Sequence, residues 1–127
     1  MDSHEVISYI ANAEKKTPCK VFLQGDLYKI NFENLDFFGE KNFGILFCEW
    51  KEFDEIYQKN KNHITNYRIE NDRRNSAIPL ADLKKYNARI EPGAVIRDLV
   101  EIGDHCIIMM GAVLNIGAVI GERTMTV

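Results

Sequence analysis

A period of six residues organises the last third of this chain. From Ile90 the sequence divides into the blocks IEPGAV, IRDLVE, IGDHCI, IMMGAV, LNIGAV and IGERTM. Each block begins with Ile or Leu, and its fifth residue is small or of modest size. Such a period predicts a parallel β-helix, because each short strand turns one aliphatic side chain inward and stacked coils share one core.

A long helix does not fit the same stretch. No period of 3.6 residues is present, and Pro92 together with the glycines argues against helix. We expect four glycines to supply backbone freedom near the corners of the coils. These are Gly103, Gly111, Gly117 and Gly121.

The composition changes near residue 88. All five tyrosines precede this point, and five of the eight glycines lie from Gly93 onward. The sequence therefore predicts a small α+β N-terminal domain over residues 1–87. Residues 88–127 would then be the start of the hexapeptide repeat, and Asn87 to Arg89 would join the two parts.

Within residues 1–87 the pattern predicts several helices and strands. They are a helix capped by Ser3 and running to about Lys16, strands at Lys20–Leu23, Phe43–Glu49 and around Ile64–Ile69, a helix at Trp50–Lys59, and a short helix at Leu80–Lys85 opened by Pro79. Asn31–Glu40 stays ambiguous, and Gly25-Asp26 predicts a turn.

Charge and cysteine usage narrow the class of protein. The net charge of −3 gives no electrostatic support for binding nucleic acid. Cys19, Cys48 and Cys106 are odd in number and lack CxxC spacing, so they predict reduced thiols in a cytosolic protein. Cys106 is expected to be a small inward residue of the repeat.

Other features of the chain predict a cytoplasmic protein without a metal. The three histidines lack the spacing of metal ligands, so no metal is expected. The start, MDSHEV, lacks the features of a signal peptide, and no apolar run is long enough to span a bilayer.

Polar residues of the repeat are the first candidates for chemistry. Asn115 and Glu122 are the outward polar residues best placed for substrate binding, with simple solvation as the alternative. His105 is the single histidine of the repeat and could act as a general base, although a corner favours an outward polar residue anyway. Arg73-Arg74 could meet an acidic ligand or form an ordinary charged loop.

Apolar residues also occupy outward positions of the repeat. They are Val95, Ile107, Met109, Met110, Val113 and Val119. Outward apolar side chains on several strands imply a covered surface, formed by subunit packing or by the wall of a ligand site. Both interpretations predict an oligomer.

The run ARIEPGAVIRDLVEIGDHCIIMMGAVLNIGAVIGERTM resembles the tetrahydrodipicolinate N-acetyltransferases, which belong to the hexapeptide-repeat acyltransferases. The segment MMGAVLNIGAVIGE is the most specific part, and residues 1–87 resemble the family's N-terminal domain. The resemblance implies a left-handed parallel β-helix with three hexapeptides per coil, a hand that departs from the usual right-handed crossover. It also implies a homotrimer with active sites between subunits.

The resemblance implies a reaction as well. Acetyl-CoA would donate its acetyl group to the amine of L-2-amino-6-oxopimelate, the open form of tetrahydrodipicolinate, in bacterial lysine and diaminopimelate synthesis. The acceptor is thus a small amino-dicarboxylate. Met110, Asn115 and Glu122 are the candidate substrate-binding residues, and no catalytic residue is assigned.

The repeat is expected to form about two coils over residues 90–125. An offset of 18 residues would place Ile90 over Ile108, Ile96 over Leu114 and Ile102 over Ile120.

The end of the chain departs from the family pattern, which resembles GEGTM-aliphatic-Asp. Arg123 stands for a glycine, Thr126 for an inward aliphatic residue and Val127 for the Asp. Family members also continue further, so this stretch is expected to be a truncated β-helix that is inactive by itself. Two alternatives stay open: a hexapeptide acetyltransferase for another amine or a sugar, and a non-catalytic trimerising module.

Overall fold

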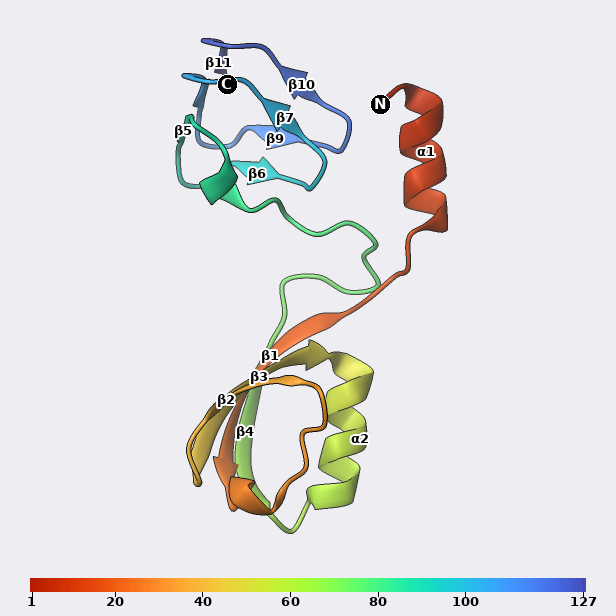
Figure 1. Ribbon diagram of the computed structural model, residues 1–127, viewed down its shortest axis with the longest axis vertical. Helices are drawn as coiled ribbons and strands as arrows, with labels where there is room; N and C mark the ends of the chain where they lie inside the picture. Colours follow the sequence, from red (N-terminus) through yellow and green to blue (C-terminus); the bar gives the residue numbers. More distant parts are fainter. The chain divides into compact units, whose positions relative to one another are not determined.

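The computed structural model describes all 127 residues and divides the chain into two compact units (Figure 1). One unit is continuous, Lys15–Ser76. The other joins Met1–Glu14 to Ala77–Val127, so the first helix, α1 (Ser3–Asn12), groups with the repeat. The division at residue 87 rests on a change in sequence composition and stays a prediction; the contacts divide the chain after Glu14 and after Ser76 instead.

The unit Lys15–Ser76 is an antiparallel sheet with one helix on it. Its elements are β1 (Pro18–Gly25), a 3₁₀ turn (Leu27–Lys29), β2 (Asp36–Gly39), β3 (Phe43–Glu49), α2 (Trp50–Asn60) and β4 (Ile64–Glu70). The strand order is β2-β3-β1-β4. Phe53 and Ile56 of α2 are buried with Val21 and Leu46 of the sheet, which places the core between α2 and one sheet face.

A capping box fixes the start of α2 directly after β3. Glu49 accepts a hydrogen bond from the Lys51 backbone N–H at 2.7 Å, and Glu52 Oε1 accepts one from the Glu49 N–H at 2.9 Å. This reciprocal pair satisfies two donors that the first turn of a helix leaves free. The predicted strand Phe43–Glu49 and the following helix are confirmed, as is a strand over Ile64–Glu70.

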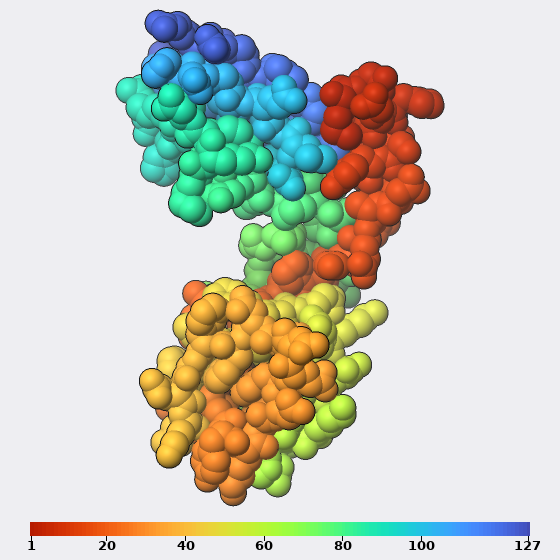
Figure 2. Space-filling view, viewed as in Figure 1, coloured from red at the N-terminus to blue at the C-terminus, as the bar shows by residue number.

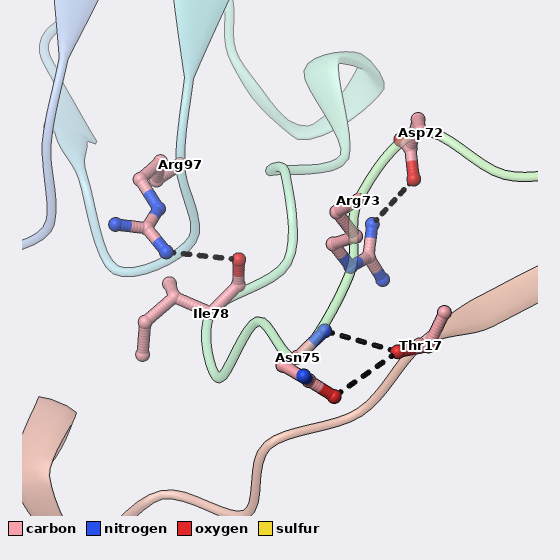
Figure 3. Close-up of polar contacts among 6 residues, drawn as sticks. All are labelled: Thr17, Asp72, Arg73, Asn75, Ile78 and Arg97. Atoms are coloured by element: carbon pink, nitrogen blue, oxygen red, sulfur yellow. Dashed lines mark hydrogen bonds and ion pairs between the residues drawn. The ribbon is translucent and has the colours of Figure 1, made fainter.

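The two ends of this unit are held together. Lys16 and Ser76 form a two-way backbone bridge with N···O distances of 3.0 and 2.9 Å. Thr17 Oγ1 accepts from the Asn75 N–H at 3.0 Å and lies 3.4 Å from Asn75 Oδ1 (Figure 3). The chain therefore enters and leaves Lys15–Ser76 at one point, as an inserted domain does.

Several predicted element boundaries are wrong. Asp2, not Ser3, caps α1, because its Oδ1 accepts from the Glu5 N–H at 2.8 Å; the helix ends at Asn12, well short of Lys16. The strand predicted at Lys20–Leu23 is only the middle of β1, which runs from Pro18 to Gly25. The ambiguous Asn31–Glu40 contains β2.

The helix predicted at Leu80–Lys85 is only a 3₁₀ turn at Leu83–Lys85, capped by Asp82. The reason is that Leu80 forms an antiparallel bridge with Arg97.

The repeat, residues 89–127, forms seven two-residue strands. They are β5 (Arg89–Ile90), β6 (Val95–Ile96), β7 (Glu101–Ile102), β8 (Ile107–Ile108), β9 (Val113–Leu114), β10 (Val119–Ile120) and β11 (Met125–Thr126). Every third strand pairs in parallel, giving the sheets β5-β8-β11, β6-β9 and β7-β10. The predicted pairs Ile90 with Ile108, Ile96 with Leu114 and Ile102 with Ile120 are all confirmed.

The first coil is closed by residues 78–88. The Ala81 N–H donates to Ile96 O at 2.9 Å, and the Asp98 N–H donates to Pro79 O at 2.9 Å. The Tyr86 hydroxyl donates to Val100 O at 2.7 Å while its ring packs against the core of the repeat. This segment gives the stacked coils a cap, which repeat folds need to shield their terminal core.

A left-handed backbone recurs at each corner of the repeat. Positive φ angles between 59° and 86° occur every six residues, at Gly93, Leu99, His105, Gly111, Gly117 and Arg123. The expectation for glycine was thus correct at Gly111 and Gly117 and wrong at Gly103 and Gly121, whose φ angles are not positive. Three corners hold a residue with a Cβ: Leu99, His105 and Arg123. The left-handed conformation costs such a residue about 1–2 kcal/mol of conformational free energy.

Arg123 offers a direct test of this strain. Its φ is 59° and its side chain is exposed, so replacing it by glycine removes a Cβ penalty without removing core contacts. Arg123→Gly is expected to stabilise the protein by up to about 1 kcal/mol, measured by urea unfolding. Arg123→Ala removes the same charge but keeps the Cβ, so an equal gain in both variants would contradict the explanation.

Candidate functional site

The structure places the three candidate substrate residues on three different corners of the repeat. Met110 lies between β8 and β9, Asn115 between β9 and β10, and Glu122 between β10 and β11. Each of these connections joins a different pair of the three parallel sheets. One chain therefore does not bring the three side chains together, and a single site containing all of them would require more than one chain.

Asn115 is the candidate with a defined polar environment. Its Oδ1 accepts from the Ile116 N–H at 2.9 Å and from Arg97 Nη1 at 3.3 Å. Arg97 lies one coil earlier, and its Nη2 donates to Ile78 O at 3.3 Å (Figure 3). Arg97 is not among the residues predicted from the sequence, although its offset of 18 residues from Asn115 places the two on stacked corners.

The other candidate residues remain on the surface. Met110 is 65% exposed, and the side chains of Glu122 and His105 are exposed as well. His105 adopts φ 64° and donates its backbone N–H to Asn87 O at 2.8 Å, which gives it a role in the corner. Arg73 pairs with the neighbouring Asp72 at 3.3 Å, and Arg74 is exposed, so this loop fits an ordinary charged surface.

Apolar side chains lie open on the outer faces of the repeat. Val95, Val113, Val119 and Met125 are 44%, 71%, 63% and 60% exposed, while Ile107 and Met109 are half-buried. A surface with this many exposed aliphatic groups marks a site of contact in most soluble proteins.

α1 covers one corner of the repeat. A Cβ built at Gly117 would lie 2.7 Å from Val6 Cγ2, so the helix packs on this corner at close range. Figure 2 shows α1, in red, against the later coils, in blue. Beside it lies a hollow of about 270 Å³, lined by Met1, Lys85, Leu99, Val100, Glu101, Gly117, Ala118 and Val119.

The three cysteines are free thiols in protected places. Cys19 and Cys48 face each other across β1 and β3 with their sulfurs 3.9 Å apart. Burial raises the pKa of Cys48 to about 12, with a further rise from Cys19, and burial also raises the pKa of Cys19. Cys106 is 1% exposed and donates to Gly121 O at 3.0 Å, as expected for an inward residue.

These environments predict slow alkylation. A thiol with a pKa of about 12 is about one part in ten thousand thiolate at pH 8, and the thiolate is the reactive form. Native protein treated with iodoacetamide at pH 8 is expected to show almost no labelling of Cys48, with labelling rising toward pH 10. Mass spectrometry of urea-unfolded protein supplies the control, in which all three cysteines react. Fast native labelling of Cys48 would contradict its raised pKa.

Neither helix has the length and apolar character needed to cross a membrane. No group of three or more His, Cys, Asp and Glu side chains is arranged to hold a metal ion.

Comparison with known proteins identifies the family. Residues 1–83 match the family described as "Tetrahydrodipicolinate succinyltransferase N-terminal". The chain is also 64% identical, over 112 residues, to the protein named 2,3,4,5-tetrahydropyridine-2,6-dicarboxylate N-acetyltransferase of Petrotoga mobilis; the match covers 88% of this chain and 48% of that protein. This chain thus spans about half the length of its relative. On the match of residues 1–83, the chain belongs to the tetrahydrodipicolinate succinyltransferase N-terminal family.

Proposed function

We propose that this chain carries the N-terminal domain and first coils of an N-acetyltransferase of lysine and diaminopimelate synthesis. The enzyme transfers the acetyl group of acetyl-CoA to the amine of L-2-amino-6-oxopimelate, the open form of tetrahydrodipicolinate. The observation that carries the proposal is the 64% identity to a relative named as such an N-acetyltransferase. Stacked coils with an 18-residue offset support it, because they agree with the resemblance of the repeat to this family.

The acyl donor is the first point to test. The family description names a succinyltransferase, whereas the relative is named an N-acetyltransferase. Release of free CoA by the protein that includes the downstream coding sequence should be followed with acetyl-CoA and with succinyl-CoA. We expect acetyl-CoA to be used when the amino-oxopimelate is present. Turnover with succinyl-CoA alone would assign the family's other chemistry, and turnover of sugar amines would favour another hexapeptide acetyltransferase.

The active enzyme is proposed to be a cytoplasmic homotrimer of left-handed β-helices, with sites between subunits. Two observations support this assembly: aliphatic residues such as Val113 and Val119 are exposed in one chain, and the candidate residues Met110, Asn115 and Glu122 lie on separate corners. Subunit packing would cover the first set and bring parts of the second together across an interface.

Association can be measured directly. The longer protein is expected to sediment as a trimer at micromolar concentration. Val113→Asp would place a charge on the proposed interface and is expected to weaken the trimer. Asp104 is already polar, so the control Asp104→Asn should leave the trimer intact. A monomeric wild-type protein would refute the assembly.

The 127-residue polypeptide by itself is proposed to be inactive in acetyl transfer. Val127 stands where the family pattern has Asp and can neither accept nor donate a proton, and a general acid–base group contributes about 100- to 10,000-fold. The coils that family members carry beyond this stretch would also help to position the two reactants. Such positioning is worth still more, up to roughly 7–11 kcal/mol. CoA release equal to that of the longer protein would contradict this.

A further inference from the structure

Arg97 differs from the other five arginines of the chain. Arg68, Arg74, Arg89 and Arg123 are exposed, and the half-buried Arg73 pairs with Asp72. Arg97 is half-buried as well, yet no carboxylate lies within ion-pair distance of its guanidinium. The adjacent Asp98 approaches Lys85 instead, at 3.8 Å. A partly desolvated positive charge without a counter-ion is costly unless an anion balances it.

The guanidinium is also held in a fixed orientation. Nη1 donates to Asn115 Oδ1 and Nη2 to Ile78 O, both at 3.3 Å, so the group spans the cap and the second coil. Its backbone N–H donates to Leu114 O at 3.1 Å. A guanidinium has five N–H donors, and only two are used here, so the remaining three are available to a ligand.

Asn115 adds further donors at the same place. Because its Oδ1 accepts from both Arg97 and the Ile116 N–H, the amide is oriented and its NH₂ group has no protein acceptor. The side chain of Asn115 is exposed, so a ligand can reach it. The pair therefore offers one positive charge and several N–H donors, with no acceptor left for a second donor.

We propose that Arg97 and Asn115 form a carboxylate subsite that binds one carboxylate of the acceptor substrate. A carboxylate supplies two acceptor oxygens and the missing negative charge, and it matches the fork of a guanidinium. The relative's name specifies a 2,6-dicarboxylate, so this assignment rests on the proposed function for its substrate class. Arg97 would select acceptors that carry a carboxylate and would fix one end of the molecule.

Binding is tested on the 127-residue chain without acetyl-CoA. The probe is pyridine-2,6-dicarboxylate, and the readout is the Nε–H signal of Arg97 and the NH₂ signals of Asn115 by ¹⁵N NMR. Both sets are expected to shift saturably. At matched ionic strength, sulfate should need an at least about tenfold higher concentration to produce the same shifts. An equal response to sulfate would show a general anion site and would overturn the carboxylate subsite. The absence of a saturable shift with the dicarboxylate would overturn it as well.

Variants separate ligand binding from a structural role. Arg97→Gln is expected to weaken binding of the probe at least about tenfold, and Arg97→Lys should restore part of it because the charge returns. Arg89→Gln is the matched control, since Arg89 is exposed and pairs with Glu91 at 3.1 Å. Unchanged affinity in folded Arg97→Gln, or an equal loss in Arg89→Gln, would overturn the assignment.

The same variant in the longer enzyme distinguishes the two proposals. Arg97→Gln should raise KM for the amino-dicarboxylate by about tenfold and leave KM for acetyl-CoA unchanged. Turnover with an unchanged KM would reject the carboxylate subsite alone. Binding of the probe without any acetyl transfer would reject the proposed reaction and leave the subsite standing.

Discussion

Replacing Ile108 with Asp is expected to unfold the repeat. Ile108 is 0% exposed, and β8 pairs with both β5 and β11, so the new carboxylate would lie in the core between coils. No basic side chain is buried there to balance it. Loss of the aliphatic group alone costs about 2–5 kcal/mol, and burial of the unpaired charge adds to that.

Thermal unfolding followed by circular dichroism measures the effect. Val113→Asp is the matched control, because Val113 lies on the adjoining strand β9 with 71% of its surface exposed. The control is expected to keep nearly the wild-type midpoint in the 127-residue chain. If Ile108→Asp kept it as well, the inward assignment of every sixth residue would be wrong.

The repeat could be predicted because its determinants are local in sequence. A period of six decides which side chain of each two-residue strand faces inward, so the sequence alone places Ile96, Ile108 and Leu114 in the core, where they are buried. The positive φ at Leu99, His105 and Arg123 could not be predicted, since glycine is the residue that signals such corners. Stacking imposes the corner geometry even where the residue disfavours it.

Local cap geometry and long-range contacts together account for the misplaced boundaries. Asp2 and Ser3 are both good N-caps, and only the geometry of the Glu5 N–H decides between them. α1 buries no residue completely, so its amphipathic pattern could not reveal that it packs on the corner at Gly117. Leu80 pairs with Arg97 instead of forming a helix. This pairing depends on a coil that lies later in the chain.

The candidate site was only partly accessible to sequence reasoning. Asn115 was selected as an outward polar residue, and its hydrogen bonds give that choice a physical basis. Arg97 could not be predicted, because an arginine at a corner resembles ordinary surface charge. Arg97 is distinguished by its burial and by the lack of a counter-ion, and both depend on contacts between residues far apart in the sequence.

Gly103 is expected to be intolerant of alanine because of close stacking, even though its backbone is not left-handed. A Cβ at Gly103 would lie 2.6 Å from the Glu122 backbone nitrogen and 2.9 Å from its Cα, so the coil above would have to move. Gly103→Ala should therefore destabilise the protein by about 1–3 kcal/mol and lower the thermal midpoint by roughly 5 °C or more. Gly121 occupies the equivalent position one coil later, and a Cβ there would meet only Thr124 Oγ1 at 4.0 Å. Gly121→Ala should therefore leave the midpoint of the 127-residue chain nearly unchanged, and equal effects of the two substitutions would show that glycine is needed for conformation and not for the approach of the coils.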